Sequence, residues 1–223
     1  MGVLGAVVAI VHRDVLLDIR RRVEAGSMLV FSVSAGLLSA YVMRSAAGVN
    51  AAATSIALTL VLVFLAVFGS LSSFVREADR GTLDGLRLAP IGAEAVFMAK
   101  FIYSMAVILL QTLVFLASMG FFAQIVSVLR LVVLLLALVS SMYLAAVSSF
   151  TSAILVFSEA RAVLMPVMVL VLVLPYIQSA APSIVAALAG SPVSLLEVGW
   201  LAAAALLFAG LTVWLSRYVL EEV

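Results

Sequence analysis

Six long apolar runs limit what this chain can fold into more than any other feature of its sequence. A helix needs about 20 mostly apolar residues to cross the hydrocarbon of a bilayer. Hydrophobic residues make up 66% of the 223-residue chain and charged residues 10%, which is more apolar surface than a soluble core could bury. We therefore predict an all-α membrane protein with one six-span bundle over residues 1–223. The expected spans cover residues 27–43, 51–75, 101–122, 131–157, 162–181 and 195–216.

The distribution of Lys and Arg between the predicted loops indicates the orientation. With the N-terminus inside, the outer loops hold Arg44 and Arg130 only, and the other ten basic residues fall on the inner side. Cytoplasmic loops carry an excess of such residues. We therefore expect a multi-pass protein of the cytoplasmic (inner) membrane, with both termini and the 76–100 segment in the cytoplasm. The inner basic residues are Arg13, Arg20, Arg21, Arg22, Arg76, Arg80, Arg87, Lys100, Arg161 and Arg217.

Residues 1–26 have the pattern of a helix that lies in the membrane interface. Val7, Val11, Val15, Ile19 and Val23 recur every four residues, and the basic residues fall elsewhere. Such a pattern suits a helix with its basic side toward anionic lipid headgroups. Two interpretations stay open: a simple amphipathic anchor, or an elbow helix that shapes the cytoplasmic side of a transporter.

Other residues predict how the spans pack and bend. Small residues that recur at helical spacing let helices approach closely. Proline is expected to bend the fifth span, and the apolar stretch 182–194 is expected to dip into the bilayer as a short re-entrant helix. The small residues are Ser32, Gly36 and Ala40 in the first span, and Ser141, Ala145, Ser148 and Ser152 in the fourth; the prolines are Pro166 and Pro175.

Catalytic and cofactor motifs are missing from the sequence. No cysteine is present, which excludes disulfides, Zn–thiolate sites and covalent haem attachment through CxxCH. His12, the only histidine, is expected to lie on the surface without a ligand. No Walker A sequence occurs, so ATP hydrolysis would reside in a partner chain. The net charge of +1 and the absence of a basic face argue against a nucleic-acid partner.

Two polar residues within the predicted spans are candidates for a transport path. Gln111 lies deep in the third span, and Glu197 lies near the outer end of the sixth. A buried glutamine more often bonds a neighbouring helix. A carboxylate near a span end is more often solvated at the interface. We expect packing for Gln111 and an interfacial position for Glu197.

The segment 76–100 holds eight of the chain's 12 basic and 11 acidic residues, between two apolar runs. Gly81 is expected to end the helix that extends from the second span, and Thr82 can cap a new one. Pro90 stops or bends that helix, and a second helix is expected to begin near Gly92 and to run past Lys100. A short apolar helix flanked by charges resembles a docking element for a soluble partner.

The order of residues in this loop resembles the cytoplasmic loop of ABC-2-type permeases, and most closely that of the CcmB branch. In that family the loop carries the coupling helix, which rests in a groove of the ATP-binding subunit. The CcmB branch is the haem exporter B subunit of cytochrome c maturation. The residues that carry the resemblance are Glu77, Asp79, Gly81, Thr82, Leu83, Asp84, Leu86, Leu88 and Pro90, followed by Lys100.

The resemblance implies a set of partners and leaves two rival functions open. It implies a homodimer of the permease, a CcmA-like ABC ATPase, a haem-handling membrane protein and a haem chaperone. It implies haem as the transported ligand, with no cofactor bound by the chain itself. The rivals are an ABC-2 exporter of a drug, lipid or polysaccharide, and a membrane scaffold that transports nothing.

Overall fold

The computed structural model describes residues 3–20, 22–45, 51–72, 81, 92–124, 130–155 and 158–221. Within these ranges the secondary structure is helical, as predicted, with short turns between helices. The helices are α1 (Val3–Arg20), α2 (Arg22–Ser45), α3 (Ala51–Ser72), α6 (Ala93–Ala123), α7 (Leu131–Leu155), α8 (Arg161–Ala189) and α9 (Leu195–Glu221).

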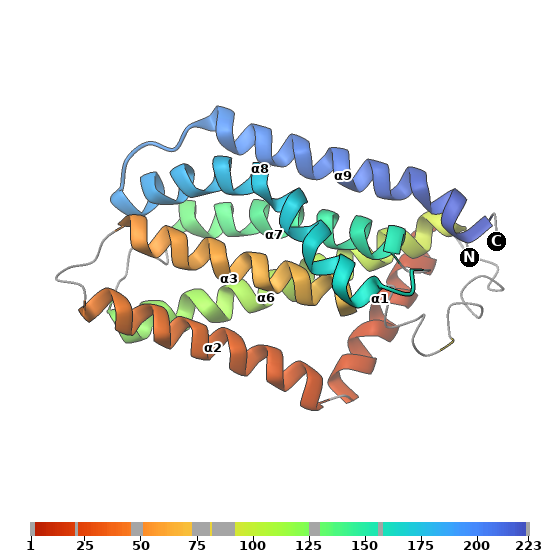
Figure 1. The fold of residues 1–223 in the computed structure, drawn as a ribbon, viewed down its shortest axis with the longest axis horizontal. Helices are drawn as coiled ribbons and strands as arrows, with labels where there is room; N and C mark the ends of the chain where they lie inside the picture. Colours follow the sequence, from red (N-terminus) through yellow and green to blue (C-terminus); the bar gives the residue numbers. More distant parts are fainter. Residues whose placement is uncertain are drawn as a thin grey trace.

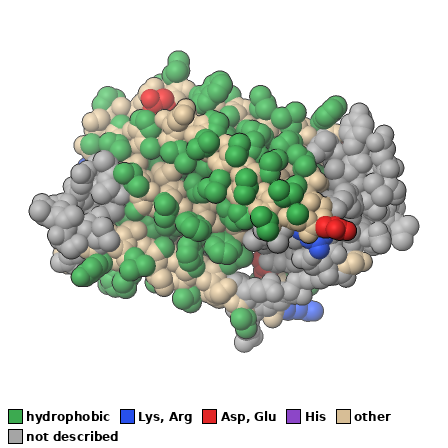
Figure 2. Space-filling view, viewed as in Figure 1, with side chains coloured by type: hydrophobic (Ala, Val, Ile, Leu, Met, Phe, Trp, Pro, Cys, Tyr) green, Lys and Arg blue, Asp and Glu red, His purple; other side chains and the backbone are tan. Residues whose placement is uncertain are grey.

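The helices from α2 to α9 run alongside one another as an up-and-down bundle, and α1 crosses their direction steeply at one end (Figure 1). The C-terminal end of α9 lies at that same end. Hydrophobic side chains cover the middle of the face shown in Figure 2, and the few charged side chains lie toward its two ends. This distribution is typical of a bundle whose middle is surrounded by hydrocarbon.

Four of the described helices are long and apolar enough to cross a membrane. They are α6, α7, the Val163–Ala189 part of α8 and the Leu195–Trp214 part of α9. The described parts of α2 and α3 add two shorter apolar helices, Gly26–Tyr41 and Ser55–Phe68. The expected six-span count therefore stays a prediction, and four candidate spans are established by length and composition.

Helix α7 is the centre of the bundle, in contact with α3, α6, α8 and α9. Its predicted small face is confirmed, because Ser141, Ala145, Ser148 and Ser152 are all buried. The hydroxyl of Ser148 donates a hydrogen bond to the carbonyl oxygen of Ala66 on α3 at 2.8 Å. Small side chains thus let α7 approach the neighbouring helices closely. The serine hydroxyls of α7 can then donate hydrogen bonds to backbone carbonyls of those helices.

The second predicted small face, on α2, packs against α6. Ser32, Gly36 and Ala40 are buried. A Cβ atom added at Gly36 would lie 1.9 Å from the Ser118 hydroxyl and 3.0 Å from the carbonyl oxygen of Phe115. Only a residue without a side chain permits this approach.

The prediction of a re-entrant helix over residues 182–194 is wrong. Helix α8 continues through Pro166, Pro175 and Pro182 to Ala189, bending along its length (Figure 1). It ends at Gly190, whose φ of 78° places it in the left-handed region. The amide of Ser191 donates to the carbonyl of Ala186 at 2.9 Å, and that of Gly190 to Ala187 at 3.3 Å, which is a Schellman motif. The few residues that remain before α9 are too short for another helix.

Helix α1 packs on α6 through a face that the four-residue stripe did not describe. Its buried residues are Ala6, Val7, Ile10 and Asp14. Of the predicted stripe, Val7 belongs to this contact, whereas Val15 and Val23 are exposed. An α-helix has 3.6 residues per turn, so residues spaced by four drift around the helix by about 40° at each step. The later residues of the stripe therefore do not face α6. An interfacial position for α1 stays a prediction.

Candidate functional site

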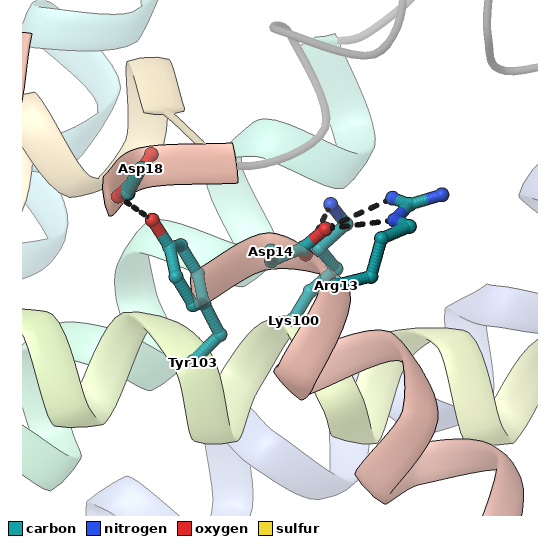
Figure 3. A network of polar contacts seen from close by, with 5 residues as sticks. All are labelled: Arg13, Asp14, Asp18, Lys100 and Tyr103. Carbon is teal, nitrogen blue, oxygen red and sulfur yellow. Dashed lines mark hydrogen bonds and ion pairs between the residues drawn. The ribbon is translucent and has the colours of Figure 1, made fainter. Parts of the chain in front are cut away.

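A buried ion pair joins α1 to the first turns of α6. The ammonium nitrogen of Lys100 lies 2.8 Å from Oδ2 of Asp14, and their side chains are 4% and 6% exposed (Figure 3). The guanidinium of Arg13 donates to Oδ1 of the same carboxylate, from Nε at 3.1 Å and from Nη2 at 2.9 Å. One carboxylate of α1 is therefore held between a buried lysine and a partly exposed arginine.

A second polar contact lies beside the first. The hydroxyl of Tyr103 on α6 donates to the carboxylate of Asp18 on α1 (Figure 3). Asp14 and Asp18 are four residues apart and Lys100 and Tyr103 three, so each pair lies on one face of its helix. Together the two contacts define what we call the α1–α6 junction: Arg13, Asp14, Asp18, Lys100 and Tyr103.

Apolar side chains surround the junction and strengthen its electrostatics. Ala6, Val7 and Ile10 of α1 form a buried cluster with residues at the beginning of α6. Taking two charges out of water costs several kcal/mol for each ion, and their mutual attraction in a low-dielectric interior offsets that cost only with good geometry. Sliding α1 along α6 would separate Asp14 from Lys100 and leave a buried charge without this partner, which would cost free energy.

The junction was missed from the sequence. Lys100 was counted among the basic residues that mark the inner side; it lies in α6, within the helix expected to run past it, but it is buried. Asp14, Asp18 and Tyr103 were not singled out. The available signal was the pair of aspartates spaced by four in α1, opposite a lysine and a tyrosine spaced by three. Nothing local to either segment indicates that they meet.

The coupling-loop residues fall largely outside the described part of the chain. Gly81 is described, and its φ of 65° places it in the left-handed region of backbone conformation. A Cβ there would meet no atom within 4 Å, so only backbone strain of about 1 to 2 kcal/mol would oppose a side chain. Helix α6 begins at Ala93 after an N-cap at Gly92, which confirms the predicted helix start. The residues outside the described ranges are Glu77, Asp79, Thr82, Leu83, Asp84, Leu86, Leu88 and Pro90.

The two candidate path residues lie far from the junction. Gln111 is buried on the face of α6 that packs inside the bundle. Glu197 is partly exposed in the first turn of α9, and it accepts a 2.7 Å hydrogen bond from the Ser183 hydroxyl of α8. His12 is exposed on α1. Among the residues that the structure describes, no group of three metal-ligating side chains comes together.

A bundle with four helices long and apolar enough to cross a membrane has the character of a multi-pass membrane protein. Comparison with known families agrees with this class: the sequence matches the ABC-2 type transporter family over residues 5–175. The chain therefore belongs to the ABC-2 type transporter family. No curated protein matches the sequence.

Membership of this family sets the general role of the chain. It is a multi-pass membrane permease component of an ABC transporter, and the family implies an ABC ATPase as partner. The matched region includes α1, the 76–100 loop and α6, so both sides of the α1–α6 junction lie within it.

Proposed function

We propose that this chain couples ATP hydrolysis by a separate ATPase subunit to movement of its own helices through the 76–100 loop. The α1–α6 junction is the observation that carries this proposal. Helix α6 begins at Ala93, within the 76–100 segment, and Lys100 follows the Gly92 cap by about 12 Å along the helix axis. A force applied to the loop would act on α6 beside the point at which α1 is attached.

The junction gives such a force a defined path. Because a buried ion pair and a tyrosine–aspartate hydrogen bond join α1 to α6, the two helix ends would move as one body. Closure of the ATPase subunits on ATP would displace the loop, and α6 with α1 would shift as a rigid unit against α7. Two copies of the chain would pair with two ATPase subunits, and the loops and both termini would face the cytoplasm.

Loss of the ATPase after substitution in the loop tests the proposal. Leu83→Asp with Leu86→Asp should leave the protein inserted and abundant, because on the proposed topology the loop would be cytoplasmic. It should abolish co-purification of the ATPase, since removing a buried leucine costs about 2 to 5 kcal/mol in a well-packed site. Co-purification from membranes, quantified against the amount of permease, measures this.

The matched control carries the same change at the opposite end of the bundle. Leu195→Asp with Leu196→Asp alters two leucines that are both highly exposed at the beginning of α9. This control should keep the ATPase bound. Unchanged ATPase binding in the loop variant would show that the loop is not the coupling element and would favour a scaffold that transports nothing.

We further propose that the transporter serves haem delivery in cytochrome c maturation, as a CcmB-like subunit. The support is the sequence of the loop and the prolines of the fifth span. On this proposal the partners are a CcmA-like ATPase, a haem-handling membrane protein and a haem chaperone. The rival is an ABC-2 exporter of a drug, lipid or polysaccharide. The match to the general ABC-2 family is equally compatible with this rival, because it does not distinguish these cargoes.

Deletion of the gene distinguishes the two cargo classes. Under the haem proposal, deletion should remove covalently bound haem from c-type cytochromes, as seen by haem staining of membrane and soluble fractions. Wild-type protein and His12→Ala should restore it equally, because the exposed His12 lies on α1 outside the polar junction. Normal c-type cytochromes in the deletion strain would rule out the haem role and favour the exporter.

A further inference from the structure

We propose that an anionic phospholipid binds in a groove at the end of the bundle opposite α1, with its phosphate on Arg130. The groove has a volume of about 540 Å³ and lies between the beginning of α7 and the α8–α9 connection. That connection lies at the far end from α1 (Figure 1). Among the described residues that line it, Arg130 alone is charged. This ligand is independent of the transported cargo and of the ATPase.

The backbone at the end of α8 holds the guanidinium of Arg130 in place. A Cβ at Gly190 would lie 2.9 Å from Nη1 of Arg130, so the absence of a side chain there lets the guanidinium approach the helix end. Nη1 donates to the carbonyl oxygen of Ala187 at 3.4 Å, a long hydrogen bond. This is its one hydrogen bond to the described residues. A guanidinium has five N–H donors, so most of them stay available to a ligand.

The charge around the groove favours an anion. Glu197, in the first turn of the neighbouring α9, is absent from the lining. Its carboxylate accepts the hydroxyl of Ser183 instead. The described lining of the groove thus places no carboxylate beside Arg130. A planar guanidinium binds a phosphate through two parallel hydrogen bonds, which makes arginine well suited to phosphate.

The remainder of the groove fits an acyl chain. Leu135, Leu136 and Val139 of α7 line it on successive turns from Arg130, and Val198 of α9 faces them. From Arg130 to Val139 the helix rises about 13 Å, enough for a large part of an acyl chain. A phosphate site followed by an apolar wall of this length matches a phospholipid better than a free anion.

Lipid binding to the detergent-solubilised full-length chain, measured by native mass spectrometry, tests the proposal. Phosphatidylglycerol and phosphatidylcholine with identical acyl chains are the probes, and glycerol phosphate represents the headgroup without chains. The wild type should bind phosphatidylglycerol about tenfold more tightly than phosphatidylcholine, because both lipids present a phosphodiester to Arg130 but the choline ammonium of phosphatidylcholine repels the guanidinium. Glycerol phosphate should not displace it at equal concentration.

Variants distinguish the groove from general attraction of anions. Arg130→Gln should remove the preference for phosphatidylglycerol, and Arg130→Lys should keep part of it. Arg20→Gln, which neutralises an exposed arginine of α1 at the other end, should retain the full preference. Leu135→Asn should weaken the binding of both lipids to the same extent. An unchanged preference in Arg130→Gln would show that Arg130 only caps α8, and displacement by glycerol phosphate would indicate a free-anion site; either result overturns the proposal.

Discussion

Lys100→Met should lower the free energy of unfolding by about 3 to 5 kcal/mol, because it leaves the buried carboxylate of Asp14 without its nearest cation. Arg13 retains its hydrogen bonds to the other carboxylate oxygen, but its own side chain is 42% exposed and cannot follow the carboxylate into the interior. Reversible unfolding in mixed micelles, compared with wild-type protein, measures the change.

A double variant separates the loss of the pair from the loss of one partner. Asp14→Leu with Lys100→Met replaces the pair by apolar side chains and should recover most of the stability, because no buried charge is left. Arg20→Met removes an exposed arginine of the same helix and should change stability by no more than about 0.5 kcal/mol. If Lys100→Met changes the free energy of unfolding no more than Arg20→Met does, the lysine does not hold α1 to α6.

The double variant also tests what the junction does for coupling. If the pair determines the register of α1 on α6, the apolar version should be stable and should still bind the ATPase. Its transport-linked ATP hydrolysis should fall, because apolar side chains specify the register less strictly. Hydrolysis equal to that of the wild type would mean that the pair contributes to stability alone.

Gly36→Ala is expected to have the next largest effect, a loss of about 1 to 3 kcal/mol from overpacking the contact between α2 and α6. The new Cβ would lie 1.9 Å from the Ser118 hydroxyl, 3.0 Å from the Phe115 carbonyl oxygen and 3.1 Å from the Met119 amide nitrogen. The hydroxyl can rotate away, but the two backbone atoms belong to α6 and cannot move without shifting the helix. The same unfolding assay measures the loss.

Gly26→Ala is the matched control, since it lies in the same helix and its Cβ would meet no atom within 4 Å. It should stabilise the protein by about 0.5 to 1 kcal/mol through reduced backbone entropy in the unfolded chain. Ser118→Ala added to Gly36→Ala should recover only part of the loss, because the backbone contacts remain. Equal stability of the two single variants would show that α2 does not pack tightly on α6.

Local pattern was enough to predict the class of this protein and several of its contacts. The apolar runs required lipid as solvent. The spacing of Ser32, Gly36 and Ala40 placed small residues on one face, and Gly92 began α6 where expected. These features depend on residues that are neighbours along the chain, so composition and periodicity contain them. The general family followed from the loop sequence and agrees with the match over residues 5–175.

Only the tertiary structure decided the role of Lys100 and the course of α8. Counting charges treated Lys100 as solvated, because the count contains no information on which helix lies against which. Its partner Asp14 is 86 residues away in the sequence, and only the packing of α1 on α6 brings them together. The stretch 182–194 was expected to form a separate re-entrant helix, yet α8 continues through Pro182 to the Schellman motif at Gly190. A proline frees backbone groups that neighbouring helices can satisfy, so whether it ends a helix depends on those neighbours. The sequence by itself therefore determined the solvent, the small faces and the proline bends, and the packing determined the buried charges and where α8 ends.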